Sequence, residues 1–241
     1  NIAGNAAKPF ARESLYICDK VYPKNADRKH IYSSVERSLK LLGTDYIDLY
    51  LLHWREDADL AEVAYCMEDL KDRGWIRRWG VSNFDVDDME DLWKVPDGNK
   101  CTVNQVLYNL GTRGIEYDLL DWQREKGVPF MAYSPVGQAG ALTTQDGVSK
   151  SVLMSDPHVK AVADRHGISI VQLLLAFVLR YDDMVAIPKA VSFDHVEENS
   201  SDGRRPGGTF CFIPGADGED PNGKILEKAE EDEQTTREKV F

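Results

Sequence analysis

Six short apolar runs, separated by longer stretches of helical pattern, constrain the fold of this chain most strongly. The runs are LYICDKV (15–21), IDLYLLHW (47–54), IRRWGVSNF (76–84), CTVNQV (101–106), VPFMAYSP (128–135) and MVAIPKA (184–190). Near-continuous apolarity is typical of parallel strands covered on both faces, whereas half-exposed antiparallel strands alternate in polarity. Strands that alternate with helices predict βαβ units and a parallel sheet.

The stretches between the runs carry helical periodicity and helix-stop residues. Ile31, Val35 and Leu39 recur at helical spacing before Gly43, and glycine is the usual residue just past a helix end. By the same test the predicted helices are 28–43, 59–74, 86–95, 116–127 and 168–183, with a further helix over 6–12.

Two parallel architectures fit this alternation. A doubly wound nucleotide-binding fold normally carries a GxGxxG turn after its first strand, and the sequence contains none. A (β/α)8 TIM barrel instead places functional residues at the carboxyl ends of many strands. Polar residues in the last positions of the runs follow this second rule: Lys20, His53, Ser82, Asn83, Asn104, Gln105, Tyr133, Ser134 and Lys189. We therefore predict an α/β fold, a (β/α)8 barrel with six βα units present and its first two strands lacking.

Composition narrows the function classes. The 241 residues include 29 Lys+Arg and 41 Asp+Glu, giving a formal charge of −12, which repels phosphate backbones and argues against nucleic-acid partners. No apolar run approaches the roughly 20 residues that span a bilayer, so we expect no membrane segment. The four cysteines are widely spaced without a CxxC pair, which predicts free thiols, no metal site and a cytoplasmic protein.

The composition changes near residue 199. Residues 200–224 are rich in Gly, Pro and Asp without a period, and the remainder is highly charged. We predict a barrel part over 1–199 and a disordered or extraneous tail over 200–241.

Six ordered motifs carry a family resemblance. They are CDKV (18–21), LGTDYIDLYLLHW (42–54), WGVSNF (79–84), VNQVLYNL (103–110), FMAYSP (130–135) and VAIPKAVSFDHVEEN (185–199). From residue 8 to residue 199 the chain resembles the aldo-keto reductases, and among them the bacterial group near the diketogulonate reductases. The resemblance implies an oxidoreductase that uses NADPH, with NADH as the alternative, to reduce small aldehydes or ketones to alcohols.

The resemblance also implies roles for individual residues. Lys20 matches the lysine whose positive charge lowers the pKa of a proton-donating tyrosine, and His53 matches the histidine that orients the substrate carbonyl. Trp54 is expected to wall the substrate pocket. Asp19 departs from the family, which usually has Thr or Ser there.

The remaining matches concern the cofactor. Tyr133 corresponds to the residue that stacks on nicotinamide, and Lys189 to the lysine that meets the 2′-phosphate. His195 stands where many relatives carry a second cation, often arginine. The other expected cofactor residues are Ser82, Asn83 and Gln105 for the carboxamide, Ser134 and Pro135 near the pyrophosphate, and Glu198 and Asn199 for adenine.

The family's proton-donating tyrosine and its aspartate precede the lysine, yet the first tyrosine here is Tyr16, within the Lys20 run. We therefore expect an N-terminally incomplete chain with impaired reduction. A non-catalytic NADPH-binding regulatory subunit is the main alternative, and an unrelated barrel enzyme that binds a phosphorylated sugar is another. The oligomeric state stays open, with a monomer expected for an intact family member.

Overall fold

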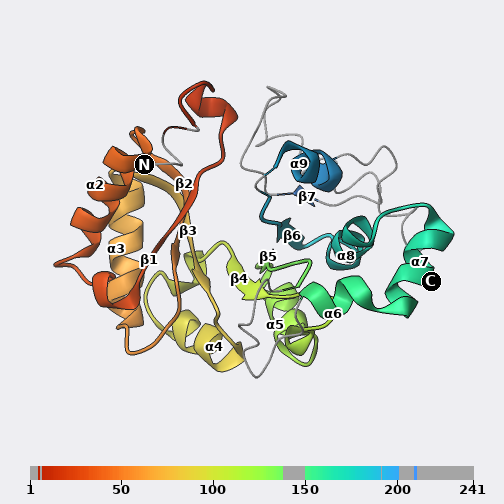
Figure 1. Ribbon diagram of the computed structural model, residues 1–241. Coiled ribbons are helices and arrows are strands. Elements are labelled where there is room, and N and C mark those ends of the chain that lie inside the picture. The colour runs from red at the N-terminus through yellow and green to blue at the C-terminus, as the bar shows by residue number, and fades with distance from the viewer. Residues whose placement is uncertain (1–4, 6, 138–149, 191, 201–208, 211–241) are drawn as a thin grey trace. The chain divides into compact units, whose positions relative to one another are not determined.

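A computed structural model (Figure 1) describes residues 5, 7–137, 150–190, 192–200 and 209–210. These residues fall into two compact units. Unit 1 holds the described residues up to 105 together with 125–128, and unit 2 holds 106–124 and the described residues from 129 to 210. Apart from residues 200, 209 and 210, the predicted tail lies outside the described residues.

Unit 1 contains a parallel sheet. Its strands are β1 (Cys18–Val21), β2 (Ile47–Leu52), β3 (Ile76–Ser82) and the start of β4 (Asn104–Leu107). β1 pairs with β2, β2 with β3, and β3 with β4, all in parallel. Every residue of β2 is buried, as expected of a strand covered on both faces. The parallel arrangement predicted from the apolar runs is therefore confirmed in this unit.

Helices with well-formed ends cover the unit 1 sheet. They are α2 (Ile31–Leu42), α3 (Leu60–Asp72) and α4 (Val86–Lys94), and α2 and α3 run beside β1–β3 in Figure 1. α2 ends at Gly43 in the left-handed conformation, with φ of 74°. The Asp59 carboxylate accepts hydrogen bonds from the first turn of α3. Short 3-10 helices are η1 (Arg12–Ser14), η2 (Pro23–Asn25) and η3 (Gly98–Lys100).

The helix predicted over 6–12 is wrong over its second half, because residues 8–10 form a turn and a bend ahead of η1. The Arg12 side chain leaves this segment to bond Thr44 Oγ1 at 2.7 Å and Asp48 Oδ2 at 2.6 Å. Asp48 also accepts the backbone N–H of Ile17 at 2.8 Å. These tertiary hydrogen bonds hold the segment beside β2. We attribute the early end of the predicted helix to them, because a helix continuing to residue 12 would not form them.

Unit 2 contains a second set of parallel strands and most of the remaining helices. The strands are β5 (Phe130–Tyr133), β6 (Met184–Ile187) and β7 (Thr209–Phe210), with β5 paired to β6 and β6 to β7. The helices are α5 (Leu119–Lys126, whose last two residues belong to unit 1), α6 (Lys150–Ser155), α7 (Pro157–His166), α8 (Ile170–Val178) and α9 (Phe193–Ser200), with the 3-10 helix η4 (Gly114–Glu116). β7 lies within the predicted tail and was not expected as a strand.

α8 is the apolar core helix of unit 2. Leu174, Leu175 and Val178 are buried on it, and it ends where the Arg180 guanidinium bonds the Phe177 carbonyl at 2.6 Å. The helix therefore stops short of residue 183, where the apolar pattern predicted its end. Over the described residues no single helix is long and apolar enough to cross a bilayer, although α7 and α8 together, bent by 91°, satisfy length and composition.

Candidate functional site

Lys20 and His53 lie at the carboxyl ends of neighbouring strands. Lys20 faces Leu51 in the register of β1 and β2, and His53 directly follows β2, where its N–H donates to the Val21 carbonyl at 2.9 Å. Carboxyl ends of parallel strands meet at one edge of a sheet. The structure thus brings the two residues together in unit 1, as the sequence predicts.

Ser82, at the end of β3, connects this pair to the next strand. Its hydroxyl accepts a hydrogen bond from Lys20 Nζ at 3.2 Å and donates to the Gln105 carbonyl at 2.8 Å. The side chain of Asn83 donates to Ser82 Oγ at 3.3 Å and to the His53 carbonyl at 3.0 Å. Five of the predicted site residues therefore form one hydrogen-bonded cluster, which we call the Lys20 cluster: Lys20, His53, Ser82, Asn83 and Gln105.

The electrostatics of the cluster favour neutral His53. Burial lowers the pKa of His53, and the nearby positive charge of Lys20 lowers it further. Burial also lowers the pKa of Lys20, while Cys18 acts in the opposite direction. A neutral imidazole keeps one N–H to donate and one bare nitrogen, which suits hydrogen bonding to a carbonyl oxygen.

The rings of Tyr22 and Trp54 lie against the His53 ring of the cluster. The Tyr22 ring stacks on the His53 ring with centroids 5.1 Å apart and planes at 23°, and Trp54 lies 4.3 Å from the His53 ring. Trp54 is an expected pocket residue, but Tyr22 was missed. Its signal was its position two residues beyond Lys20, because residues i and i+2 of an extended chain point to the same face.

Asn83 has an unusual backbone. Its φ is 60°, in the left-handed region that asparagine tolerates better than most residues. Its N–H donates to the Gln105 carbonyl at 2.8 Å, so the chain turns sharply where β3 ends. Non-glycine residues held in this region concentrate at functional sites. This turn lets the Asn83 side chain reach back to His53 and Ser82.

Asn104 and Gln105 occupy a different position from the predicted one. Both were expected at the end of the 101–106 run, but β4 begins at Asn104 and continues to Leu107. Residues 101–103 precede the strand because Cys101 and Thr102 bond back to η3 and to the Trp79 carbonyl. Gln105 still reaches the cluster because it is paired with Ser82.

Unit 2 carries a second group of predicted residues. Tyr133 is the last residue of β5, half-buried, and burial raises the pKa of its phenol. Ser134 follows with φ of 50°, and its carbonyl accepts from Asn109 Nδ2 at 3.1 Å. Pro135 comes next and is buried. This strand end therefore presents an aromatic ring followed by a sharply turned backbone.

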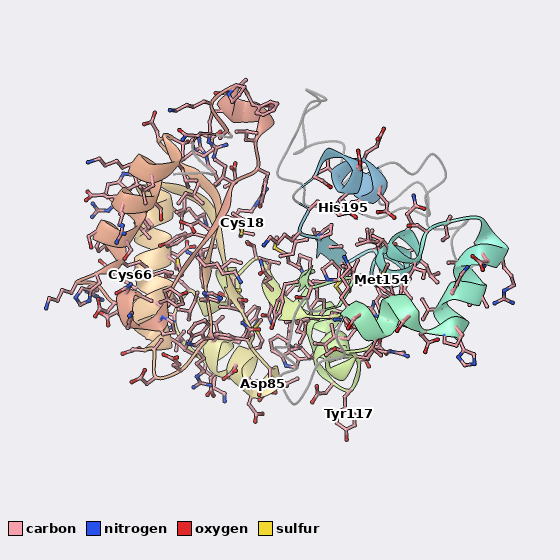
Figure 2. The ribbon with its side chains drawn as sticks, in the orientation of Figure 1. Cys18, Cys66, Asp85, Tyr117, Met154 and His195 are labelled. Carbon is pink, nitrogen blue, oxygen red and sulfur yellow. The ribbon has the colours of Figure 1, made fainter. Side chains whose placement is uncertain are left out.

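The predicted phosphate and adenine residues lie around β6 and α9. Lys189 is exposed two residues past the end of β6. His195 is exposed on α9, where Figure 2 labels it, and its N–H donates to Ser192 Oγ at 3.3 Å. Glu198 is half-buried and Asn199 is buried on the same helix.

Two surface hollows of unit 1 are lined by other residues. One surface hollow of unit 1 lies where α2 turns into β2, and another lies at the start of α3. Within the described ranges no three His, Cys, Asp or Glu side chains gather as metal ligands would.

The chain was compared with known proteins. Residues 1–202 match the family model described as the aldo/keto reductase family. Methylglyoxal reductase YeaE of Escherichia coli K12 is 47% identical over 190 residues, covering 79% of this chain and 64% of the relative. Glyoxal reductase of Bacillus subtilis is 31% identical over 190 residues, covering 79% of this chain and 63% of the relative. The chain thus spans less than two thirds of the length of these curated relatives.

A solved structure gives the same result. The aldo/keto reductase from Klebsiella pneumoniae, in complex with NADP and acetate, is 45% identical with a TM-score of 0.76, covering 82% of this chain and 67% of that one. This likeness confirms the expected fold class, part of a (β/α)8 barrel. The alternative of an unrelated barrel enzyme is wrong. Motif order, fold and family match agree, and the chain belongs to the aldo/keto reductase family.

Proposed function

We propose that this chain binds NADPH and a small carbonyl substrate and serves the reduction of that carbonyl to an alcohol. The observation that carries the proposal is the Lys20 cluster, in which hydrogen bonds join the Lys20 ammonium, Ser82 Oγ, the Asn83 side-chain amide and the backbone carbonyl of His53. The names of two relatives, methylglyoxal reductase and glyoxal reductase, support small dicarbonyl aldehydes as the substrate class.

The residues present fit a nicotinamide cofactor. Carboxamide recognition needs paired donors and acceptors, and side-chain amides such as those of Asn83 and Gln105 are groups of this kind, although Asn83 Nδ2 already donates to the His53 carbonyl and to Ser82 Oγ. The half-buried ring of Tyr133 offers a flat apolar face, and Lys189 offers a cation for a 2′-phosphate. The expected pyrophosphate and adenine residues are Ser134, Pro135, His195, Glu198 and Asn199. When bound, the reduced cofactor supplies a hydride to the substrate carbon.

The chain's own residues would orient and polarise the carbonyl. Neutral His53 donates one N–H to the carbonyl oxygen, and Trp54 with Tyr22 packs against the carbon skeleton. Lys20 adds a positive charge near the oxygen, where negative charge develops as hydride arrives. The sequence holds no tyrosine before Tyr16 to match the family's proton donor. General acid catalysis contributes typically 10²–10⁴-fold, so we expect slow reduction by this chain alone.

A cofactor titration tests the proposal. Tryptophan fluorescence quenching would be recorded with NADPH and with NADH for the parent chain, for Lys189→Ala and for the control Lys160→Ala. Lys160 is an exposed lysine of unit 2 that pairs with Asp164 at 2.7 Å. We expect the Lys189 variant to lose roughly tenfold in NADPH affinity and little in NADH affinity, because one charged phosphate contact is worth about 1.5 kcal/mol.

Absence of NADPH binding by the parent chain would refute the proposal. If Lys189→Ala lost equal affinity for NADPH and for NADH, Lys189 would not be the residue that binds the 2′-phosphate. Oxidation of NADPH with methylglyoxal is the activity measurement, and rapid turnover would contradict the expected deficit in proton donation. Binding without turnover would favour the non-catalytic alternative.

The cellular setting is proposed from the thiols. Among the described residues Cys18, Cys66 and Cys101 are in no disulfide, which suits a reducing cytoplasm. We propose a cytoplasmic monomer, and size-exclusion chromatography with light scattering checks the oligomeric state.

A further inference from the structure

Arg55 joins the chain that follows β2 to the helix that follows β3. Its guanidinium donates from Nη1 to Asp88 Oδ1 at 2.7 Å and from Nη2 to Asp91 Oδ2 at 2.8 Å, and both carboxylates belong to α4. Lys94 Nζ donates to the other oxygen of Asp91 at 2.9 Å. A network of alternating charges holds its geometry better than an isolated surface ion pair does. We call these four residues the Arg55 clamp.

α4 gives the Arg55 clamp a fixed base. Met89 and Leu92 of this helix are fully buried. Its first turn is closed by a capping box, in which the Asp85 carboxylate accepts the Asp88 N–H at 2.9 Å and the Asp88 carboxylate accepts the Asp85 N–H at 3.3 Å. Because α4 begins only four residues after the last residue of β3, a side chain bonded to α4 is held near that strand end.

Trp54 lies between two ties to the chain that follows β3. The residue before it, His53, accepts a hydrogen bond on its carbonyl from Asn83 Nδ2 at 3.0 Å, and the residue after it is Arg55. The Trp54 ring centroid lies 4.3 Å from that of His53 and 5.1 Å from that of Tyr22. Ties on both sides of Trp54 restrict the directions in which its ring can point.

The backbone directly after Arg55 is held in an uncommon conformation. Glu56 has a φ of 44°, in the left-handed region where asparagine, aspartate and histidine are enriched and glutamate is not. It lies in a tight turn in which the Ala58 N–H donates to the Arg55 carbonyl at 3.0 Å. Such a conformation persists where surrounding contacts over-determine it. The Arg55 clamp supplies contacts of this kind at the start of the turn.

We propose that Arg55 is a positioning residue of the substrate pocket: through Asp88 and Asp91 it fixes the chain that carries Trp54, and so sets where the Trp54 ring meets the substrate beside His53. Arg55 acts through Trp54 and supplies no group to the reacting atoms. The assignment rests on the proposed function only in taking Trp54 as a wall of the pocket.

Fluorine NMR of protein labelled with 5-fluorotryptophan tests the assignment without any cofactor. The full chain would carry the label at its five tryptophans, and Trp54→Phe would assign the resonance of interest. The variants are Arg55→Ala, Arg55→Lys and Asp91→Asn. The control is Arg73→Ala, which removes another unit 1 arginine that pairs with a carboxylate of α3 at 2.6 Å and lies 5.8 Å from the Trp75 ring centroid.

We expect the Trp54 resonance of Arg55→Ala to shift toward its position in urea-unfolded protein, because the ring leaves its aromatic neighbours. Arg55→Lys should keep part of the parent shift, since the charge is retained and the two-armed fork is lost. Arg73→Ala should move the Trp75 resonance and leave that of Trp54 in place. The urea midpoint should stay within about 0.5 M of the parent value in every variant, because partly exposed ion pairs contribute little to global stability.

Two outcomes of the fluorine spectra would overturn the assignment. One is an unchanged Trp54 resonance in Arg55→Ala. The other is an equal movement of all tryptophan resonances with a large fall in the urea midpoint, because that would indicate a general loss of structure. Asp91→Asn, which removes a charge from one arm of the clamp at a partly exposed position, keeps the test decisive if Arg55→Ala does not fold.

Titration of the His53 ring by proton NMR separates positioning from a direct effect of charge. Burial lowers the pKa of His53, and the charge of Lys20 lowers it further. If Trp54 leaves the imidazole, solvent reaches the ring, so the pKa should rise in both Arg55→Ala and Asp91→Asn. Acting through charge alone, loss of the cation would raise the pKa and loss of the carboxylate would lower it. Opposite shifts in the two variants would overturn the assignment.

These measurements fail independently of the proposed function. A parent chain that binds no NADPH would refute the proposed function. The Trp54 resonance and the His53 titration need neither cofactor nor turnover, so they would still decide whether Arg55 positions Trp54.

Discussion

Replacement of Gly80 by alanine should loosen the junction between β3 and the chain that enters β4. A Cβ at residue 80 would stand 2.4 Å from the Val103 carbonyl oxygen and 2.7 Å from Val103 Cγ1. Ordinary van der Waals contact begins near 3.4 Å, so the two backbones must separate by about 1 Å. The Val81 N–H donates to that same carbonyl at 3.0 Å, and this bond would lengthen with the separation.

The loss of stability in Gly80→Ala follows from the steric overlap with Val103 and from the lengthened hydrogen bond between Val81 and Val103. Overpacking of a core costs typically 1–3 kcal/mol, and a weakened backbone hydrogen bond adds about 1 kcal/mol. The higher strand propensity of alanine returns roughly 0.5–1 kcal/mol. We expect Gly80→Ala to lower the free energy of unfolding by about 2 kcal/mol.

Urea unfolding followed by tryptophan fluorescence measures this loss. Four of the five tryptophans lie in unit 1, so the signal reports mainly on the unit that contains Gly80. The control is Gly114→Ala in unit 2, where a Cβ meets no atom within 4 Å and the backbone φ is ordinary, and both variants are therefore also followed by far-UV circular dichroism, which reports on both units. Equal stability of the Gly80 variant and this control would refute the reasoning, because it would mean that the close approach to Val103 carries no energy.

Three further outcomes are expected. Asp48→Ala should lower the free energy of unfolding by about 3 kcal/mol in urea titrations, because its arginine partner and a buried backbone N–H lose their acceptor. Burial alone would raise the pKa of Glu116, but hydrogen bonds from Arg113, Tyr108 and Arg180 lower it to about 2. The ionised Glu116 carboxylate therefore stabilises the fold fully above pH 4.5, and this stabilisation is lost as the pH falls toward 2. Acid titrations of stability should flatten in Glu116→Gln. Iodoacetamide should modify half-exposed Cys18 faster than Cys66 and Cys101, whose pKa values are raised by burial, and peptide mass spectrometry would resolve the three sites.

The strands of unit 1 could be predicted because each one is marked by a continuous run of apolar residues in its own sequence. β2 is buried along its whole length, and an unbroken apolar run is the signature of that environment. The helix ends near Gly43 and Gly74 could be predicted as well, because a helix commonly ends at a glycine that adopts positive φ, and both glycines do so in the structure. Strand boundaries were less accurate because hydrogen bonds from elsewhere decide them, as the bond from Thr102 to the Trp79 carbonyl does before β4.

One missed helix had a readable signal. Asp156 accepts from the backbone N–H groups of His158 and Val159, Pro157 occupies the first turn of α7, and Gly167 follows its end with φ of 65°. An N-cap residue followed by proline and a closing glycine is a helix pattern in any sequence. α7 has too few apolar positions to show a helical periodicity, so only its capping residues indicate the helix in the sequence.

The contacts of the candidate site were only partly predictable. Strand order and the parallel rule placed Lys20, His53 and Ser82 at one sheet edge. The position of Tyr22 two residues beyond Lys20 indicates only that both side chains point to the same face, whereas the stacking of Tyr22 on His53 depends on how the chain leaves β1 at η2. The hydrogen bond from the Ser82 hydroxyl to the Gln105 carbonyl likewise follows from the pairing of β3 with β4 in three dimensions.

The pairing of β1 with β2 also determines which charge faces Ser82. Lys20 stands opposite Leu51, and the preceding residue, Asp19, stands opposite Tyr50 and so projects to the other side of the sheet. A slip of one residue would exchange them and bring a carboxylate where the ammonium now lies. Insertion or deletion of a single residue within β1 would therefore reverse the polarity of this sheet edge while leaving the amino-acid composition almost untouched.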